Sequence, residues 1–222
     1  MIFTYPEINK IFDTECKKIN ALVIEHPKLL YRLLSDIQSQ MEGDEGKAVL
    51  SEKHKIIPIR KKLELLTQFV PFDLNKKNIV HSICSRIEKN AMEGEWYERT
   101  MRLMTELETL LYDTSFSLPG GIDFPKININ TILKSAGVEI REDQESLCEK
   151  ILDYMELVNE YEEEKLFLIV NLRSYVDDGE MSYFFDTLLR KHYHAIIIDS
   201  SEHIALSNEE RFIVDSDFCE IS

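Results

Sequence analysis

Residues 162–175 read EEEKLFLIVNLRSY, and this stretch decides the fold class. Within it, Leu166–Val170 is a run of five consecutive apolar residues with no polar face. Such a run is typical of a strand that is buried on both sides, as in a parallel sheet covered by helices. In open α/β sheets, ligands bind at the carboxyl ends of such strands. Asn171, which follows this run, could therefore lie at the edge of a nucleotide site or could simply end the strand.

The residues that follow predict a βαβ unit. Asp177 or Asp178 can cap a helix, which would then carry apolar residues on one face: Met181, Phe184, Phe185, Leu188 and Leu189. The next run, HAIIID at 194–199, reads as a second buried strand. A strand, a helix and a strand within this length predict two parallel strands with a right-handed crossover.

The N-terminal residues fit the same sheet. INALVIE at 19–25 reads as a strand that ends at Pro27, and a helix follows with one apolar face made of Leu29, Leu30, Leu33, Leu34 and Ile37. Residues 63–69 and 211–214 read as further strands. We therefore expect an α/β fold, with residues 1–72 and 161–222 forming one head domain around a largely parallel sheet.

Residues 73–160 have a different pattern and predict an inserted α-helical leg domain. Asp73 is a plausible N-cap, and apolar residues then recur at helical spacing up to Leu110, with a break at Gly94. Pro119–Gly121 cannot continue a helix. A short helix is expected at 129–135, ending at Gly137, and a further helix at 147–161.

Composition describes a globular protein, and its charge is unevenly spread. The net charge is −15, and residues 139–222 carry all of it, with 7 basic and 22 acidic residues. Residues 53–77 hold seven bases against two acids, which could grip a polyanion locally or could form a solvated surface. No segment is apolar over the ~18–20 residues that a membrane span needs, residues 1–13 do not resemble a signal peptide, and four scattered cysteines suit a reducing cytoplasm.

No enzyme class emerges from the motifs. The seven glycines form neither GxxxxGK[ST] nor GxGxxG after a strand, so we expect no nucleotide to be bound. His192 and His194 lack a third metal ligand nearby, which favours a structural role. Four carboxylates could hold a divalent ion for a nuclease, but helix capping and strand-end solvation explain them without chemistry and are favoured: Asp177, Asp178, Asp215 and Asp217.

Several stretches, in this order and spacing, resemble one known family. They are LVIE before an amphipathic helix, LTQFVPFDLN leading into IVHSICSRIE, ILKSAGVEI, KLFLIVN and the closing FIVDSDF. The most specific is ILKSAGVEI followed by LCEKILDYMELVNEYEEEKLFLIVN. Over nearly its whole length, the chain resembles the accessory DNA-end-binding protein of type II-A CRISPR adaptation, the second member of the Csn family.

The resemblance implies a fold and a function. It implies a head like a P-loop NTPase or RecA-like core that has lost its phosphate loop, with a helical leg inserted. It also implies a homotetrameric ring whose basic central hole holds double-stranded DNA threaded from an end. It implies a non-catalytic role in spacer acquisition, alongside the adaptation integrase and the effector nuclease. The N-terminus looks shorter than the two-strand opening usual in the family.

The ring suggests which residues contact DNA. A closed ring can place acidic residues outside and the few bases inside, and threading without sequence preference needs phosphate contacts only. The residues chosen by charge, and in the case of Lys134 by its position in ILKSAG, are Lys53, Lys55, Lys61, Lys62, Lys76, Lys77 and Lys134. A protein scaffold that bridges adaptation proteins, with incidental basic residues, remains the alternative.

The resemblance also implies calcium, but here the residues depart from the family. Relatives carry dense carboxylates before the helix that corresponds to ILKSAG, whereas this chain has only Asp113 and Asp123 there, with Glu106 and Glu108 upstream; of these we select Glu106, Asp113 and Asp123. Calcium takes six to eight oxygen ligands. These three residues are the candidate metal ligands, and calcium could be retained with the help of backbone carbonyls and water, or lost.

Overall fold

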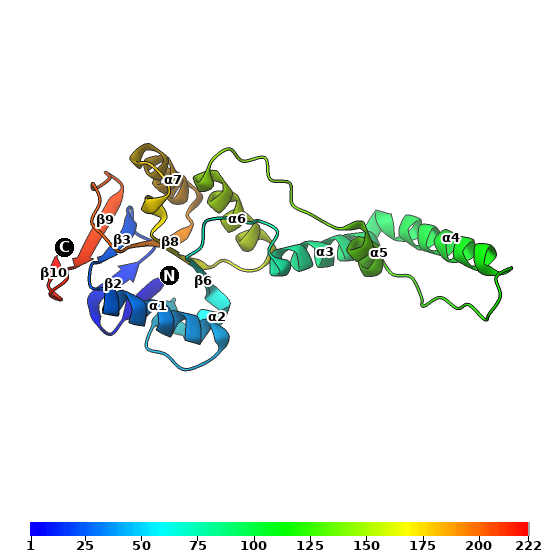
Figure 1. Ribbon diagram of the computed structural model, residues 1–222, viewed down its shortest axis with the longest axis horizontal. Helices are drawn as coiled ribbons and strands as arrows, with labels where there is room; N and C mark the ends of the chain where they lie inside the picture. Colours follow the sequence, from blue (N-terminus) through cyan, green and yellow to red (C-terminus); the bar gives the residue numbers. More distant parts are fainter. Residues whose placement is uncertain (222) are drawn as a thin grey trace. The chain divides into compact units, whose positions relative to one another are not determined.

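A computed structural model describes residues 1–221 and shows two compact units (Figure 1). The first unit joins Met1–Leu74 to the chain from Glu142 onward, and the second is Asn75–Arg141. Each unit is described by itself below. The second unit ends earlier than the leg domain expected from the sequence, because residues 142–160 belong to the first unit.

The first unit alternates strands and helices. Its strands are β1 (Ile2–Tyr5), β2 (Ile8–Asp13), β3 (Ile19–Ile24), β4 (Val49–Glu52), β5 (Lys55–Ile57), β6 (Leu63–Leu66), β7 (Leu166–Val170), β8 (His194–Asp199), β9 (Glu209–Val214) and β10 (Glu220–Ile221). Its helices are α1 (Pro27–Glu42), α2 (Ile59–Lys62), α6 (Leu147–Tyr161) and α7 (Asp178–Lys191), with a 3-10 turn η2 (Leu172–Ser174).

The larger sheet confirms the predicted parallel arrangement. Its strand order is β10-β9-β3-β8-β7-β6, and the neighbouring strands run parallel except β10, which is antiparallel to β9. Strand β7, the run that opened the sequence, is fully buried and lies beside β8. Helix α7 connects these two strands, as the βαβ prediction required, and Asp177 is its N-cap. The fold is therefore mixed α/β, as expected.

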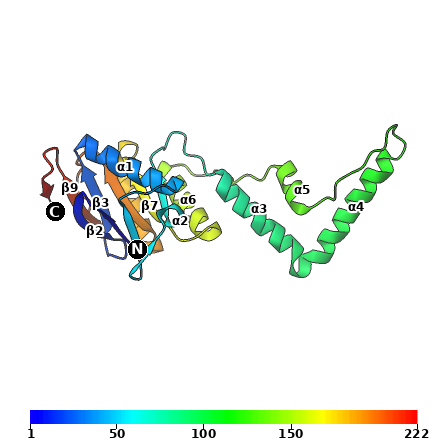
Figure 2. The same cartoon turned by 90° about the horizontal axis from the view of Figure 1, so that it is seen from below.

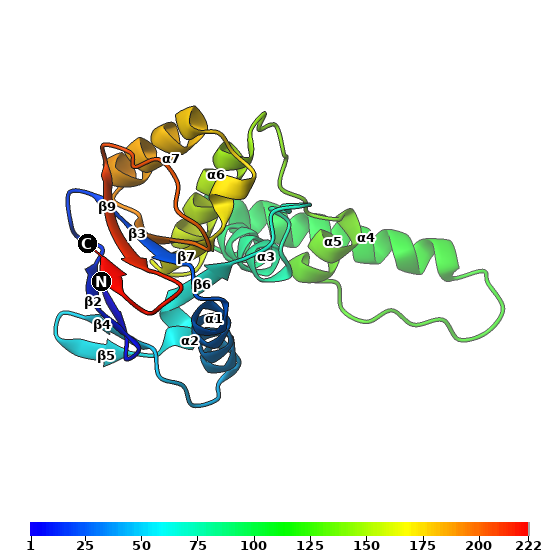
Figure 3. The ribbon, with the colours of Figure 1, turned by 60° about the vertical axis from the view of Figure 1, so that its left-hand side comes forward.

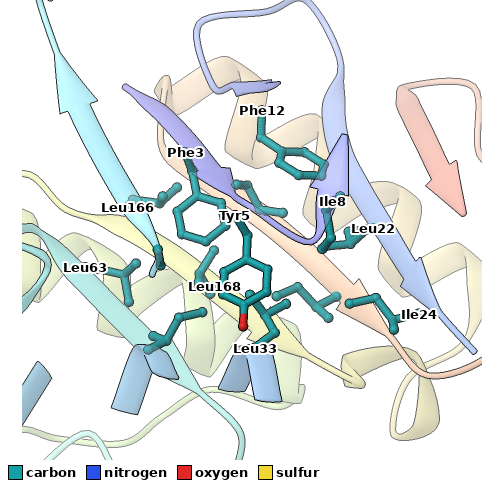
Figure 4. Close-up of a cluster of buried hydrophobic side chains, with 14 of the residues drawn as sticks. Phe3, Tyr5, Ile8, Phe12, Leu22, Ile24, Leu33, Leu63, Leu166 and Leu168 are labelled. Carbon is teal, nitrogen blue, oxygen red and sulfur yellow. The ribbon is translucent and has the colours of Figure 1, made fainter. Parts of the chain in front are cut away.

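A second sheet, β2-β1-β4-β5, was not predicted. It is antiparallel, and its first hairpin is formed by β1 and β2, so the expectation of a shortened N-terminal opening is wrong. Its buried residues Phe3, Tyr5 and Phe12 pack with α1 on one face of the large sheet (Figure 4). This sheet also ends in the β4–β5 hairpin, which carries two of the candidate lysines.

Helices α6 and α7 lie on the opposite face of the large sheet from α1 (Figures 1 and 3). Helix α6 buries an apolar side made of Ile151, Leu152, Tyr154, Met155 and Val158. This packing explains why α6 belongs to the first unit and not to the inserted leg: its apolar side needs the sheet layer to be buried.

The second unit is helical and consists of α3 (Lys77–Met92), the 3-10 turn η1 (Gly94–Trp96), α4 (Tyr97–Ser115) and α5 (Ile129–Ala136). The predicted break at Gly94 is confirmed, since this glycine has a φ of 60° between two helices. The N-cap of α3 is Lys76, so the capping role expected for Asp73 is wrong. Figure 2 shows α4 diverging from α3 after η1, with α5 beside α3.

Candidate nucleic-acid interface

The β4–β5 hairpin presents a basic tip. Strand residues Glu52 and Lys55 face each other, so Lys53 and His54 form a two-residue turn. Their φ angles of 48° and 63° are both in the left-handed region, as a type I′ turn requires. Lys53, His54 and Lys55 are all exposed. A tight turn therefore holds three adjacent side chains, two of them lysines, in solvent where a polyanion could reach them.

Helix α2 follows this hairpin directly and adds three more bases. Arg60 and Lys61 are exposed, whereas Lys62 is half-buried. The ammonium of Lys62 pairs with Glu163 at 3.0 Å and donates to the Glu164 carbonyl at 3.3 Å. The hydrogen bond from Lys62 holds the pKa of Glu163 below its ordinary value. The ammonium of Lys62 is thus already paired within the chain, and the exposed Arg60 is a better candidate for a DNA contact. Arg60 was counted among the seven bases of residues 53–77 but was not selected as a candidate.

The remaining candidate lysines lie in the second unit. Lys76 is the N-cap of α3, and Lys77, its first residue, is exposed. Lys134 is exposed in the last turn of α5, where Gly137 caps the helix with a φ of 71° as predicted. The structure therefore places Lys53 and Lys55 at the hairpin tip and Lys61 on α2, all in the first unit, and it carries Lys76, Lys77 and Lys134 on the second.

Charge is segregated within the first unit as well as along the sequence. Residues 142–222 hold 6 basic and 21 acidic residues, and so carry the whole net charge of −15. The second unit, residues 75–141, has nine of each and is neutral. Within the first unit, residues 47–62 hold six bases and one acid, Glu52. The hairpin and α2 are therefore a local basic surface on an otherwise acidic unit.

The candidate metal ligands do not come together. Glu106 and Asp113 are exposed on α4, and the Asp123 carboxylate accepts hydrogen bonds from the Tyr112 hydroxyl at 3.0 Å and the Phe124 N–H at 2.9 Å. The bond to Asp123 raises the pKa of Tyr112. Across residues 1–221, no three His, Cys, Asp or Glu side chains are grouped as a metal ion would require. Within one chain, these residues do not fit a calcium site.

The carboxylates considered for a nuclease have structural partners. Asp177 forms a capping box with Glu180 at the start of α7. Asp215 accepts hydrogen bonds from the backbone N–H groups of Asp217 and Cys219, at 2.9 and 2.8 Å, and so shapes the turn into β10. These contacts account for both residues without a metal ion.

The histidine pair is also bound within the fold. The Nδ1 atom of His194 lies 2.8 Å from the Thr14 hydroxyl, and its Nε2 atom lies 3.4 Å from Glu164. Burial and the nearby N-terminal ammonium lower the pKa of His194. His192 ends α7 in the left-handed conformation, with a φ of 55°. The two histidines thus have separate local roles.

The helix start after β3, where α/β proteins often bind phosphate, is filled by side chains. His26 caps α1, its Nδ1 accepting the Leu29 N–H at 3.2 Å, and Pro27 contributes no N–H. The Phe218 ring lies on the His26 ring with centroids 3.9 Å apart. At the end of β7, Asn171 accepts the Ser200 N–H at 2.8 Å. Both strand ends are therefore occupied by contacts of the chain with itself.

A buried ion network between β8, β9 and the β7–α7 connection was not predicted. Arg173 donates to Glu209 at 2.5 Å and lies 3.6 Å from Asp199, and the Arg173 guanidinium packs over the Phe185 ring. Burial raises the pKa of Asp199. Burial also acts to raise the pKa of Glu209, but hydrogen bonds from Arg211, Arg173 and the Leu206 N–H keep it below its ordinary value. The network joins two strands of the large sheet to the β7–α7 connection, so its role is structural.

Comparison with known families agrees with the resemblance found in the sequence. The family of CRISPR-associated proteins designated Cas_Csn2 matches residues 40–218, which is most of the chain. Among curated proteins, none matches the chain. No helix within residues 1–221 has the length and apolar character to cross a membrane. The chain therefore belongs to the Cas_Csn2 family of CRISPR-associated proteins, and this membership implies a role in CRISPR adaptation.

Proposed function

We propose that this chain binds the ends of double-stranded DNA as a non-catalytic homotetrameric ring during spacer acquisition, together with the adaptation integrase and the effector nuclease. In this proposal the head descends from a nucleotide-hydrolase core, and the side chains of His26 and Phe218 stand where phosphate would lie. Family membership supports the adaptation role. Within a single copy, the proposal gives calcium no role.

The observation that carries the DNA-binding part is the basic surface of the hairpin and α2. Lys53, Lys55 and Lys61 are exposed, and no acidic residue lies between positions 53 and 62. Flexible exposed lysines suit phosphate contacts, which carry no sequence information. The strongly acidic remainder of the unit disfavours DNA elsewhere on its surface. The first unit could therefore grip a duplex in one place only, which suits a ring with a basic lining.

The test compares charge reversal on this surface with charge reversal elsewhere on the same unit. The variant Lys53→Glu, Lys55→Glu, Lys61→Glu should lose retention of a linear duplex. The matched control reverses three exposed bases at other places: Lys17→Glu, Lys18→Glu and Lys28→Glu. The control should retain the duplex. Each lost phosphate contact lowers the slope of log K against log salt by about one, and the control loses none of the proposed contacts, so its salt dependence should equal that of the unmodified protein.

Threading is tested separately with DNA topology. Linear duplex should be retained and closed circular duplex of the same length should not, because a ring admits DNA only through an end. Equal retention of the two forms would contradict threading. Retention of linear duplex by both triple variants would contradict DNA binding through this surface, and failure of the unmodified protein to retain linear duplex would favour the second candidate, a scaffold that bridges adaptation proteins. That candidate is favoured by the exposed apolar residues of the second unit, which suit protein contacts.

A further inference from the structure

The second sheet, β2-β1-β4-β5, presents an aliphatic face to solvent. Its buried face carries Phe3, so the residues that alternate with the buried ones along each strand point outward. The side chains that define this aliphatic face are all exposed, Ile11 by 65% and Ile56 by 79%, together with Ile2 and Val49. The solvent face of an antiparallel sheet is ordinarily polar, so four aliphatic side chains on one such face point to a surface that another molecule covers.

The strand register makes these four side chains neighbours. Ile2 of β1 lies opposite Ser51 of β4, and Ile56 of β5 lies opposite the same Ser51. On the other side of Ile2 lies Asp13 of β2. The aliphatic side chains are therefore diagonal neighbours, one from each strand, in the order Ile11, Ile2, Val49 and Ile56. Diagonal neighbours on one face are within reach of long side chains, so the four form one continuous apolar path across the sheet.

The size of this face suits one helix and not a second copy of the chain. Neighbouring strands lie about 4.8 Å apart, so the path from Ile11 to Ile56 spans about 14 Å, the length of about three turns of α-helix. Four strands of about four residues each cover roughly 250 Å², whereas a stable interface buries about 800 Å² on each partner. A single amphipathic helix would cover the aliphatic side chains, while a stable dimer would need more surface than this face offers.

The acidic residues at one end of this face are mostly compensated. The β2–β3 connection and the turn of the β4–β5 hairpin leave the sheet at the same end, beyond the level of Ile2. Of the acids there, Glu15 pairs with the N-terminal ammonium at 3.4 Å, and Glu52 lies opposite Lys55 in the hairpin. Asp13 accepts the Glu15 N–H at 3.0 Å and, within residues 1–221, has no cationic partner.

The bases at this end leave an excess of positive charge. Lys17, Lys18 and Lys53 are exposed, and none makes an ion pair with another residue of the described chain, 1–221. These three lysines outnumber Asp13, the acid that lacks a cationic partner. A partner that lies across the aliphatic face is therefore attracted when its flank on this side is acidic, and it is repelled when that flank is basic.

We propose that the aliphatic face docks a single amphipathic helix of another protein. The helix lays an aliphatic stripe across the four strands and carries acidic side chains on the flank toward Lys17 and Lys18. Helix α6 buries an aliphatic stripe on the large sheet of this chain in the same way. The docking depends neither on the ring nor on DNA, so it goes beyond the proposed function.

The isoleucine methyl groups give a direct test. Methyl NMR spectra of the full chain can follow Ile2, Ile11 and Ile56 during titration with a synthetic helix of about 14 residues, which has leucines on one side and glutamates along one flank. The three signals should shift with a common midpoint. Ile204, 73% exposed on the β8–β9 connection, is the matched control and should not shift. The absence of any shift, or an equal shift of Ile204, would overturn the proposal.

The flank charge is tested with a twin peptide that has lysines in place of the glutamates. At low salt, the twin should need at least about fivefold more peptide to give the same shift. Lys17→Glu with Lys18→Glu should reverse the preference between the two peptides. Lys53 is left unaltered because it is also a proposed DNA contact. Equal midpoints for the two peptides with the unmodified protein would overturn the acidic character of the partner.

The aliphatic contacts are tested by substitution. Ile11→Ser with Ile56→Ser should raise the midpoint observed at Ile2 at least about tenfold, because two apolar side chains no longer leave water on docking. Both residues are exposed, so the melting temperature should change little. The control, Ile204→Ser, should leave the midpoint unchanged. An unchanged midpoint in the double variant would overturn docking on this face.

Two further measurements separate the docking from its alternatives. Dilution of the unmodified protein without peptide should leave the Ile11 and Ile56 signals in place. Shifts on dilution would show that a second copy occupies the face, and would overturn the proposal. The variant Ile11→Ser, Ile56→Ser should retain linear duplex as the unmodified protein does. Loss of docking with intact duplex retention therefore contradicts this inference alone, and loss of duplex retention with intact docking contradicts the proposed function alone.

Discussion

Helix α6 in the first unit and helix α4 in the second have similar apolar spacing but opposite surroundings. Helix α6 buries Cys148, Ile151, Leu152, Tyr154, Met155 and Val158, whereas α4 buries only Thr100 and Met104 and leaves its leucines in solvent. The same helical pattern therefore has two outcomes. In α6 it builds the layer that covers the sheet, whereas in α4 it leaves the leucines uncovered by the rest of the chain.

The first unit also buries charge, which the described part of the second does not. Arg173→Ala should lower the free energy of unfolding of the first unit by about 4 kcal/mol, because Asp199 would stay buried without its cation and Glu209 would keep only Arg211. Thermal or urea unfolding checks this. The control, Arg190→Ala on the exposed side of α7, should change stability by less than about 0.5 kcal/mol. Equal effects of the two variants would contradict a structural role for the network.

A matched pair of truncations addresses the contrast between the two helices directly. Ile151→Ala in α6 removes a fully buried side chain and should destabilise the first unit by about 3 kcal/mol. Leu103→Ala in α4 removes one that is 55% exposed and should change stability by less than about 0.5 kcal/mol when measured at low protein concentration. A large loss for Leu103→Ala in a dilute sample would mean that α4 is covered within its own chain.

The smallest effect is a pH dependence of the first unit. Burial and the N-terminal ammonium lower the pKa of His194 in the folded protein, whereas the unfolded chain takes up the proton near the ordinary value of about 6.5. Stability from this residue is thus present above that value and is lost as the pH falls below it. His194→Gln should flatten the slope of unfolding free energy between pH 7 and 5. An unchanged slope would contradict a buried, neutral His194.

The parallel sheet could be predicted because its signals are local. The apolar runs of β7 and β8, and the apolar face of the helix between them, can each be recognised from a short stretch of sequence. The second sheet was missed because its strands are only three to six residues long, and because β1 pairs with β4, more than forty residues away. Pairing across such a distance leaves no periodic trace in the sequence.

The candidate site was predictable in composition but not in detail. Charge counting found the basic run, but it could not tell that Lys62 is held by Glu163 while Arg60 and Lys61 remain exposed. Nor could it find the partnership of Arg173 with Glu209, which lie 36 residues apart. For α4, periodicity identified the helix but could not tell that its leucines lie in solvent, because burial depends on which segments pack against them.

The mass of the protein in solution tests the central claim most directly. In the presence of a linear duplex long enough to fill the ring, the protein component should sediment as four copies of the 26.0 kDa chain, about 104 kDa. The same material mixed with closed circular DNA should sediment free of the DNA. A protein that stays a single copy at high concentration with the linear duplex present would contradict the account.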